Sequence, residues 1–352
     1  MEAPATSGMR ADISEIPAVV ERVVGDRAAI AEVAAAVRAS GATWATIVAR
    51  GSSDHAAIYL QYLLAVYLGM PAGLALPSAS TIYGARMGWR GGLLVAISQS
   101  GQSPDVTTLV EEARGAGAVT MAITNERDSP LAAIAQHVLD CQAGPERAVP
   151  ATKTYVGCLA LAATLVAQLN PASDLAAGLA GLPDAMRRSV EESHAWLEGP
   201  GASLVDGLAA TDRALIVSRG FNLATALEVA LKLKEGCGLF AVGYSSADVM
   251  HGPMVLALPD LPVIAFRPDG VIGESVEEAV RAAEQRGASP WLIGGMDVAG
   301  RPRALSMATS LPEPLTPLAY VIAGQLLTDR LAARIGVDPD HPSGLTKVTR
   351  TL

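Results

Sequence analysis

The chain has few aromatic residues, few cysteines and no cluster of basic residues. Aromatic residues make up 4% of its 352 positions, so alanine, leucine and valine must fill the core. The three cysteines, Cys141, Cys158 and Cys237, are widely spaced and odd in number, which favours reduced thiols in a cytosolic protein over a disulfide framework. The net charge of -9, without any run of lysine or arginine, argues against nucleic acid as the main partner.

The chain also lacks an apolar run long enough to cross a membrane. The longest candidate, residues 155–169, falls short of the roughly 20 residues that a membrane span requires. The first five residues have neither the basic nor the apolar region of a secretion signal. We therefore expect a soluble, cytoplasmic protein with no membrane partner. The length of the chain and its 50% of hydrophobic residues predict two globular domains that each bury a core.

Short, continuous apolar runs alternate with helical patterns, which is typical of parallel strands covered on both faces. The predicted strands are 45–49, 93–97, 119–124 and 137–141 in a first set, and 214–218, 262–266 and 291–293 in a second. We expect an α/β fold with two tandem doubly wound sheets, each a three-layer domain of the flavodoxin-like or Rossmann-like kind. The expected parts are a short helical leader (1–30), a first domain (31–185), a second domain (200–337) and an irregular tail (338–352).

The two sets of strands repeat each other at an offset of 169 residues, or 170 after one insertion. The matching pairs are 47–51 with 216–220, 95–97 with 264–266, Gly101 with Gly270, and 117–118 with 287–288. We infer a duplicated α/β domain, with the join between about residues 168 and 206.

A polar stretch, Ser98 to Ser103, directly follows the apolar run 93–97, and we call it the serine loop. Small hydrogen-bonding residues between a buried strand and a helix form an anion cradle, because free backbone N–H groups and the positive helix end point to one place. In the second half, residues 267–269 replace Ser98-Gln99-Ser100, so the cradle occurs once. We predict that the loop binds a phosphate ester; a helix N-cap with polar neighbours is the alternative.

Residues 50–55 form a second loop of interest, between the first predicted strand and a helix. Gly51 permits a tight turn there, and Ser53 could donate a hydrogen bond to a sugar hydroxyl or a phosphate. Such a turn alone is weak evidence, and His55 is more simply interpreted as an early helix residue.

Glu228, Lys232 and Glu235 lie within one narrow arc of a predicted helix. A solvated row of ion pairs is the ordinary interpretation of this spacing. Because the helix is otherwise almost wholly apolar, the row could instead line a cleft, where a carboxylate beside a lysine can move protons near neutral pH.

His251 precedes a Gly-Pro pair in a predicted loop. Histidine acts as acid and base at pH 7, although a lone loop histidine is more often exposed and idle. No second ligand lies at metal-binding spacing around it, and the glycines after the strands lack the G-x-G-x-x-G spacing. We therefore expect neither a metal nor a cofactor such as NAD or PLP.

Six motifs, in this order, resemble the sugar isomerase (SIS) family. The similarity is to the isomerase half of glutamine:fructose-6-phosphate aminotransferase (glucosamine-6-phosphate synthase) and to the isomerase-type glucosamine-6-phosphate deaminases, and it runs over nearly the whole chain. The motifs are Gly51-Ser52-Ser53, Ser98-Gln99-Ser100-Gly101, Ala151-Thr152-Lys153, residues 226–235, His251-Gly252-Pro253, and the tail from Asp340 to Lys347.

The resemblance implies a role for each motif. The implied phosphate ligands are Ser98, Gln99, Ser100 and Ser103, and the other implied substrate-binding residues are Gly51, Ser52, Ser53, Val149, Ala151 and Glu228. Glu235 would move a proton between C1 and C2, and Lys232 would assist at the C1 oxygen or nitrogen. Lys347 would pair with the open-chain sugar or form an imine, in a tail that acts as a lid. His251 would open and close the sugar ring; in the family this histidine comes from the neighbouring subunit, so a homodimer is implied.

Two departures point to the deaminase branch. Ala151 stands where the synthases have a serine, and the ending from Lys347 to Leu352 is more like that of the deaminases. The glutaminase half of the synthases needs an N-terminal cysteine, whereas Met1 is followed by Glu2. We therefore expect no glutaminase domain in this chain and no direct use of glutamine.

These expectations combine into one predicted activity, the conversion of glucosamine 6-phosphate to fructose 6-phosphate and ammonia by aldose–ketose isomerisation. Three enzymatic alternatives stay open: a synthase-like reaction from fructose 6-phosphate and ammonia, deamination of galactosamine 6-phosphate, and cleavage of a fructosamine 6-phosphate. A non-enzymatic sugar-phosphate sensor is the fourth, although a pure binder would need only the serine loops and not Glu235, His251 and Lys347 as well.

Overall fold

The computed structural model describes residues 7–307 and 310–347. Within these ranges the chain divides into two compact units, each built around one parallel sheet. The first-sheet unit holds residues 18–145, 153–180 and 346–347. The second-sheet unit holds the residues before 18, residues 146–152 and residues 181–345. The domain boundaries expected from the sequence stay a prediction.

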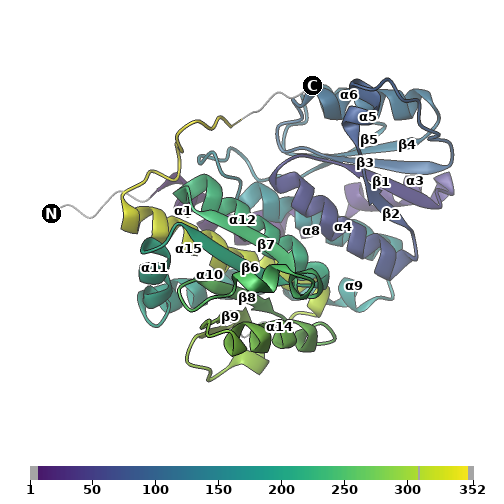
Figure 1. Cartoon of the computed structure of the whole chain (residues 1–352). Helices are drawn as coiled ribbons and strands as arrows, with labels where there is room; N and C mark the ends of the chain where they lie inside the picture. The colour runs from purple at the N-terminus through teal and green to yellow at the C-terminus, as the bar shows by residue number, and fades with distance from the viewer. Residues whose placement is uncertain (1–6, 308–309, 348–352) are drawn as a thin grey trace. The chain divides into compact units, whose positions relative to one another are not determined.

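The first-sheet unit is a five-stranded parallel sheet with helices on both faces (Figure 1). Its strands are β1 (Trp44–Val48), β2 (Ala72–Leu74), β3 (Gly92–Ile97), β4 (Val119–Thr124) and β5 (His137–Asp140), in the spatial order β2-β1-β3-β4-β5. Its helices are α2 (Ile16–Gly25), α3 (Arg27–Ser40), α4 (Ser52–Leu68), α5 (Pro77–Thr81), α6 (Pro104–Gly115), α7 (Pro130–Ile134), α8 (Lys153–Leu169) and α9 (Asp174–Gly178). Helices α4 and α8 pack together on one face, and α5 and α6 cover the other.

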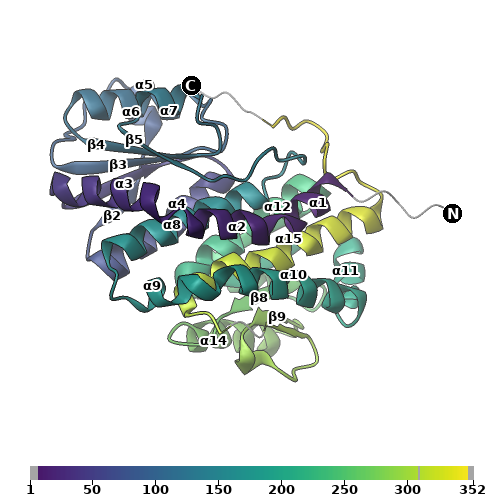
Figure 2. The same cartoon turned by 180° about the vertical axis from the view of Figure 1, so that it is seen from behind.

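The second-sheet unit repeats this architecture. Its strands are β6 (Arg213–Ser218), β7 (Phe240–Ser245), β8 (Val263–Arg267), β9 (Trp291–Gly294) and β10 (Ala304–Ser306), in the order β10-β9-β8-β6-β7. Its helices are α1 (Gly8–Ser14), α10 (Leu182–Glu198), α11 (Ala202–Ala209), α12 (Leu223–Cys237), α13 (Ser246–Met250), α14 (Gly273–Gln285) and α15 (Thr316–Ile335). Helix α15 packs against α10 and α12 on one face of the sheet, and α14 lies on the other (Figure 2).

The two sheets confirm the internal repeat. Read from the opposite edge, the second order is β7-β6-β8-β9-β10, which is the first order with each strand replaced by its counterpart. The glycines after equivalent strands also share the left-handed backbone that the turn requires. Gly51 and Gly220 have φ values of 59° and 62°, and Gly101 and Gly270 have values of 60° and 108°.

The three strands that the sequence does not predict, β2, β7 and β10, all lie at sheet edges. An edge strand is covered less than a central one, so it needs no continuous apolar run. The residues of β2 are half-buried or exposed, and most of those of β7 are half-buried, whereas every residue of β3 is buried. The chain before β1 is helical and forms α1, α2 and α3. None of the helices in the described ranges combines the length and the apolar composition that a membrane span requires.

Candidate active site

The first sheet has its topological switch point between β1 and β3. The chain leaves β1 for β2 on one side and then crosses to β3 on the other, so the loops after β1 and β3 diverge at the carboxyl ends of the strands, which is where ligands bind in such sheets. The serine loop follows β3, and the loop of Gly51 follows β1. An ion pair of 2.6 Å between Arg50, after β1, and Asp105, in the first turn of α6, links the two loops. The structure therefore brings these two predicted motifs together.

Two backbone carbonyl groups of the serine loop accept hydrogen bonds from other parts of the first-sheet unit. The Gln99 carbonyl accepts from the Asn125 amide at 3.0 Å, and the Gly101 carbonyl accepts from the Leu131 amide at 3.2 Å. In the described part of the chain, the backbone N–H groups of Gln99, Ser100 and Ser103 have no acceptor. Free N–H groups at the start of a helix form an anion cradle, so the loop can bind a phosphate.

Helix capping does not explain the serines of this loop. Ser103 is the N-cap residue of α6, yet its side chain makes no cap hydrogen bond. The Ser98 hydroxyl accepts from the Gly101 amide at 3.1 Å, and the Ser100 hydroxyl accepts from the Gln102 amide at 3.3 Å, so both stabilise the loop itself. Each hydroxyl still has a proton to donate to an anion.

The loop after β1 is a tight turn into α4. Gly51 is the N-cap of this helix, and its φ of 59° lets the chain reverse directly after the strand. Ser52 and Ser53 lie in the first turn of α4, next to Asp54 and His55. Burial raises the pKa of Asp54, and the positive charge of Arg50 acts in the opposite direction. His55 is an early helix residue, as expected.

In the second-sheet unit, the row Glu228, Lys232 and Glu235 is buried, so the solvated ion-pair interpretation is wrong. The side chains of Glu228 and Lys232 are 0% exposed, and that of Glu235 is 24% exposed. The Lys232 ammonium lies 3.4 Å from Glu228 Oε1 and 2.5 Å from Glu235 Oε2. Both carboxylates and the lysine lie on one arc of α12, as the spacing predicts.

Lys232 is a fully buried cation held by several carboxylates. Burial alone lowers the pKa of its amine, but the charges of Glu228 and Glu235, the hydrogen bond to Glu235 and the charge of Glu146 together raise the pKa above its ordinary value. Lys232 is therefore protonated at neutral pH and fixes the position of Glu235. Glu235 is the member of the row whose side chain is partly exposed.

Glu146 was not found from the sequence, because a lone glutamate in a loop has no spacing signal. It belongs to the segment 146–152, between β5 and α8, which groups with the second-sheet unit. Glu146 Oε1 accepts from the Thr152 amide at 2.6 Å, and the Thr152 carbonyl accepts from Gln325 of α15 at 3.3 Å. The segment that carries Val149 and Ala151 is thus fixed by hydrogen bonds at its end.

The tail residue Asp340 holds the same segment. Its carbonyl accepts from the Val149 amide at 3.1 Å, and its carboxylate accepts from the amides of Gly8 and Met9 at 2.5 and 2.7 Å. Asp340 therefore ties the tail, the start of α1 and the Val149 segment together within the second-sheet unit.

The remaining predicted residues lie at the ends of elements. His251 is exposed and directly follows α13. Lys347 is half-buried in the tail and groups with the first-sheet unit. The structure thus places Lys347 in one unit with the serine loop and residues 51–53, and the other predicted site residues, Val149, Ala151, Glu228, Lys232, Glu235 and His251, in the second unit.

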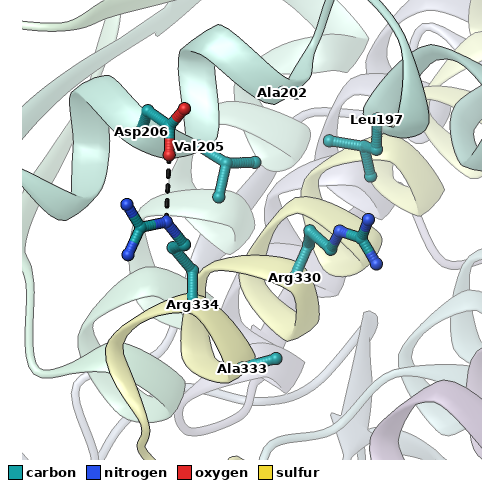
Figure 3. Close-up of a pocket in the computed structure, with 7 residues that line it drawn as sticks. All are labelled: Leu197, Ala202, Val205, Asp206, Arg330, Ala333 and Arg334. Carbon is teal, nitrogen blue, oxygen red and sulfur yellow. Dashed lines mark hydrogen bonds and ion pairs between the residues drawn. The ribbon is translucent and has the colours of Figure 1, made fainter. Parts of the chain in front are cut away.

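A hollow of about 330 Å³ lies elsewhere in the second-sheet unit, between the ends of α10 and α15 and helix α11 (Figure 3). Arg334 and Asp206 form an ion pair of 3.0 Å across it, and Arg330 and Leu197 line another side. None of the predicted site residues lines this hollow, so it does not belong to the candidate site.

A known protein family matches two segments of the chain, one in each sheet. A model of the SIS domain family matches residues 42–168 and 207–298. The chain belongs to the SIS domain family. The glutamine–fructose-6-phosphate aminotransferase (isomerizing) of Methanothermobacter thermautotrophicus is 34% identical over 308 residues, which cover 85% of this chain and 50% of the relative. The enzyme of the same name from Halobacterium salinarum is 33% identical over 86% of this chain and 51% of the relative, so the chain spans about half the length of the curated relatives it matches.

Solved structures show the same fold. A Silicibacter pomeroyi protein assigned as a phosphosugar isomerase is 33% identical, with a TM-score of 0.85 over 95% of this chain and 100% of that chain. The glucosamine-6-phosphate deaminase of Thermotoga maritima is 19% identical, with a TM-score of 0.77 over 98% of this chain and 100% of that chain. The second likeness shows the fold alone.

Each SIS range contains the switch point of one sheet. The first range includes the loop of Gly51 and the serine loop, and the second includes the row on α12 and His251. Lys347 lies outside both ranges.

Proposed function

We propose that this SIS protein is an amino-sugar phosphate deaminase of the aldose–ketose isomerase type, which converts glucosamine 6-phosphate to fructose 6-phosphate and ammonia. The names of its relatives support a substrate of this class, because those enzymes are named for fructose 6-phosphate and for isomerisation. Ala151 supports deamination over synthesis, because the resemblance described above implies a serine at this position in the synthases.

The serine loop is the proposed phosphate site. It supplies three free backbone N–H groups and the hydroxyls of Ser98, Ser100 and Ser103 at a topological switch point. A phosphate dianion there gains charge-assisted hydrogen bonds and the positive end of α6. We assign the contacts with sugar hydroxyls to Ser53 and to the Val149 segment.

The single observation that carries the chemistry is the ion pair of 2.5 Å between Lys232 and the partly exposed Glu235. A general base must be held in place and still reach the carbon acid that it deprotonates. Lys232 is 0% exposed and therefore leaves the reacting edge of Glu235 to the substrate. Glu228, on the other side of Lys232, helps to keep the lysine charged.

The proposed reaction uses one carboxylate for two proton transfers. After ring opening by His251, the Glu235 carboxylate takes the proton from C2 of the open-chain amino sugar and returns it to C1. In the same isomerisation the C1 oxygen gains a proton and the nitrogen on C2 loses one, so the product is the C2 imine of fructose 6-phosphate. Addition of one water to the imine carbon and departure of the nitrogen as ammonia leave the ketose, so atoms and charges balance without an oxidant. Lys232 assists at the C1 oxygen, and Lys347 pairs with the open-chain sugar.

Ammonia release from glucosamine 6-phosphate by the wild-type protein and by Glu235→Gln tests this proposal. We expect kcat to fall about 100- to 10,000-fold in Glu235→Gln, because the amide cannot accept the C2 proton, while KM changes much less. Glu284→Gln, at an exposed position of α14, is the matched control and should retain full activity. Equal activity of Glu235→Gln and wild type would rule out the role given to Glu235.

His251 is proposed to act in the neighbouring subunit of a homodimer. Its exposed position directly after α13 is compatible with this, because an exposed side chain can reach another chain. Subunit exchange between inactive Glu235→Gln and His251→Asn proteins should restore about a quarter of the wild-type activity, since half of the dimers then carry one intact site. No recovery after verified exchange would place His251 in its own subunit or outside the reaction.

A further inference from the structure

The switch point of the second sheet is filled by a side chain of the protein itself. It lies between β6 and β8, and the loops after these strands contain Gly220 and Gly270, the counterparts of Gly51 and Gly101. A Cβ added to Gly270 would lie 3.0 Å from Glu313 Oε2, and one added to Gly220 would lie 3.7 Å from Glu313 Oε1. The Glu313 carboxylate therefore lies against both loops.

The carboxylate lies beside the backbone N–H groups at the start of α14, which correspond to those of Gln102 and Ser103 at the end of the serine loop. The backbone amides of Ile272 and Val271, directly before α14, act to lower the pKa of this carboxylate. These residues follow β8 as the end of the serine loop follows β3. Burial outweighs this effect and raises the pKa of Glu313 above its ordinary value.

A buried network holds Glu313 in this position. It begins the short 3-10 turn Glu313–Leu315 (η5), and the Thr316 hydroxyl donates to its carbonyl at 2.7 Å. The same hydroxyl accepts from the side-chain amide of Asn222, in the loop after β6, also at 2.7 Å. Asn222 is 0% exposed and Thr316 is 4% exposed. The loop of the switch point is thus linked to the turn that carries Glu313.

At the first switch point, the atoms nearest to the equivalent glycines do not belong to a carboxylate. A Cβ added to Gly51 would have no atom within 4 Å, and the atoms nearest to one added to Gly101 belong to Ser129 and Leu131. We propose that Glu313 is an internal carboxylate ligand of a second, latent oxyanion site, and that it restricts phosphate binding to the serine loop. Only the second part of this inference rests on the proposed function.

The test removes the internal ligand and supplies small oxyanions instead. The background variant is Ser98→Ala/Ser100→Ala, in which phosphate binding by the serine loop is weakened. Its melting temperature is measured in sodium acetate, sodium phosphate and sodium chloride at equal ionic strength. With Glu313→Ala added, acetate or phosphate should raise the melting temperature by about 2–4 °C over chloride, because an external anion takes the vacated N–H groups. The matched charge control Glu284→Ala, at an exposed position of α14, should show no such gain.

The outcomes separate this inference from the proposed function. No gain for Glu313→Ala over Glu284→Ala, with either anion, overturns the inference. If wild type shows no more phosphate stabilisation than the Ser98→Ala/Ser100→Ala background, the serine-loop proposal fails, and the acetate result for Glu313→Ala still decides the latent site.

A second variant covers the case in which Glu313→Ala does not fold. Glu313→Gln keeps the shape but is a weaker, neutral acceptor, so deuterium exchange at the amides of Val271 and Ile272 should become about tenfold faster. Unchanged exchange at both amides would contradict the inference.

Discussion

The two SIS halves have the same strand order and the same glycines at their switch points, but different groups fill those points. In the first half the loop after β3 offers backbone N–H groups and three serine hydroxyls. In the second half, Arg267, Pro268 and Asp269 stand at the corresponding positions, and Glu313 lies against the loop. The duplicated scaffold therefore does not determine what is bound; a few loop side chains do.

The residues of the second loop have structural tasks instead. Arg267 forms ion pairs with Glu277 at 3.1 Å and with Asp297 at 3.0 Å. The Asp269 carboxylate accepts from the amides of Met296 and Asp297 at 2.8 and 3.1 Å. Proline at 268 has no N–H group, whereas Gln99 at the equivalent place has one. The second loop is thus occupied by bonds within its own unit.

The largest expected effect comes from placing the acidic residue of the second loop at the equivalent position of the serine loop. Ser100→Asp places a carboxylate where we propose the phosphate binds, so like-charge repulsion should raise KM for glucosamine 6-phosphate at least about 100-fold. Ser100→Ala removes only one hydroxyl and should raise KM about tenfold. The reciprocal control, Asp269→Ser, should leave KM unchanged; a similar rise of KM in that variant would mean that the two loops do not differ in function.

A smaller effect should distinguish the arginines that follow the first strand of each sheet. Arg50 pairs with the Asp105 carboxylate, which is 1% exposed, whereas Arg219 donates to the neutral Ser275 hydroxyl at 2.7 Å. Arg50→Ala leaves a buried charge without its cation and should lower the free energy of unfolding by about 2–3 kcal/mol. Arg219→Ala loses one neutral hydrogen bond and should cost about 1 kcal/mol. Urea unfolding of the two variants measures this difference, and an equal loss would contradict the proposed linkage of the two loops through Asp105.

The smallest expected effect is on the pH dependence of stability, through Glu277, which pairs with Arg267 of the second loop. Burial tends to raise the pKa of Glu277, but the hydrogen bonds and charges of Arg301 and Arg267 outweigh it and lower the pKa below its ordinary value of 4.5. A depressed carboxyl pKa stabilises the fold above the unfolded pKa, and this stability is lost as the pH falls through the folded pKa. Glu277→Gln should therefore be less stable than wild type at pH 7, and the difference should shrink below about pH 4. A difference that is the same at both pH values would argue against an electrostatic role for Glu277.

The sequence was sufficient to predict the central strands, the repeat and the serine loop, because each depends on local pattern. A continuous apolar run predicts a buried strand such as β3, and a loop that differs between two copies indicates a specific task. The edge strands β2, β7 and β10 were missed because a partly covered strand needs no such run.

Burial and long-range contacts could not be predicted in the same way. The spacing of Glu228, Lys232 and Glu235 is the same on a solvated face and on a buried one, so only the packing of α12 decides between the two. The contacts of Glu146 with Thr152 and of Glu313 with the loops of the second sheet depend on how distant segments fold together. Neither residue lies in a motif that the sequence makes visible.

A crystal structure with bound glucosamine 6-phosphate tests the central claim most directly, namely that the two equivalent switch points have different tasks. We predict that the phosphate lies at the serine loop, within hydrogen-bond distance of the amides of Gln99 and Ser100, and that the Glu313 carboxylate remains beside the amides of Val271 and Ile272. A phosphate at Val271 and Ile272, with Glu313 displaced and the serine loop empty, would contradict it.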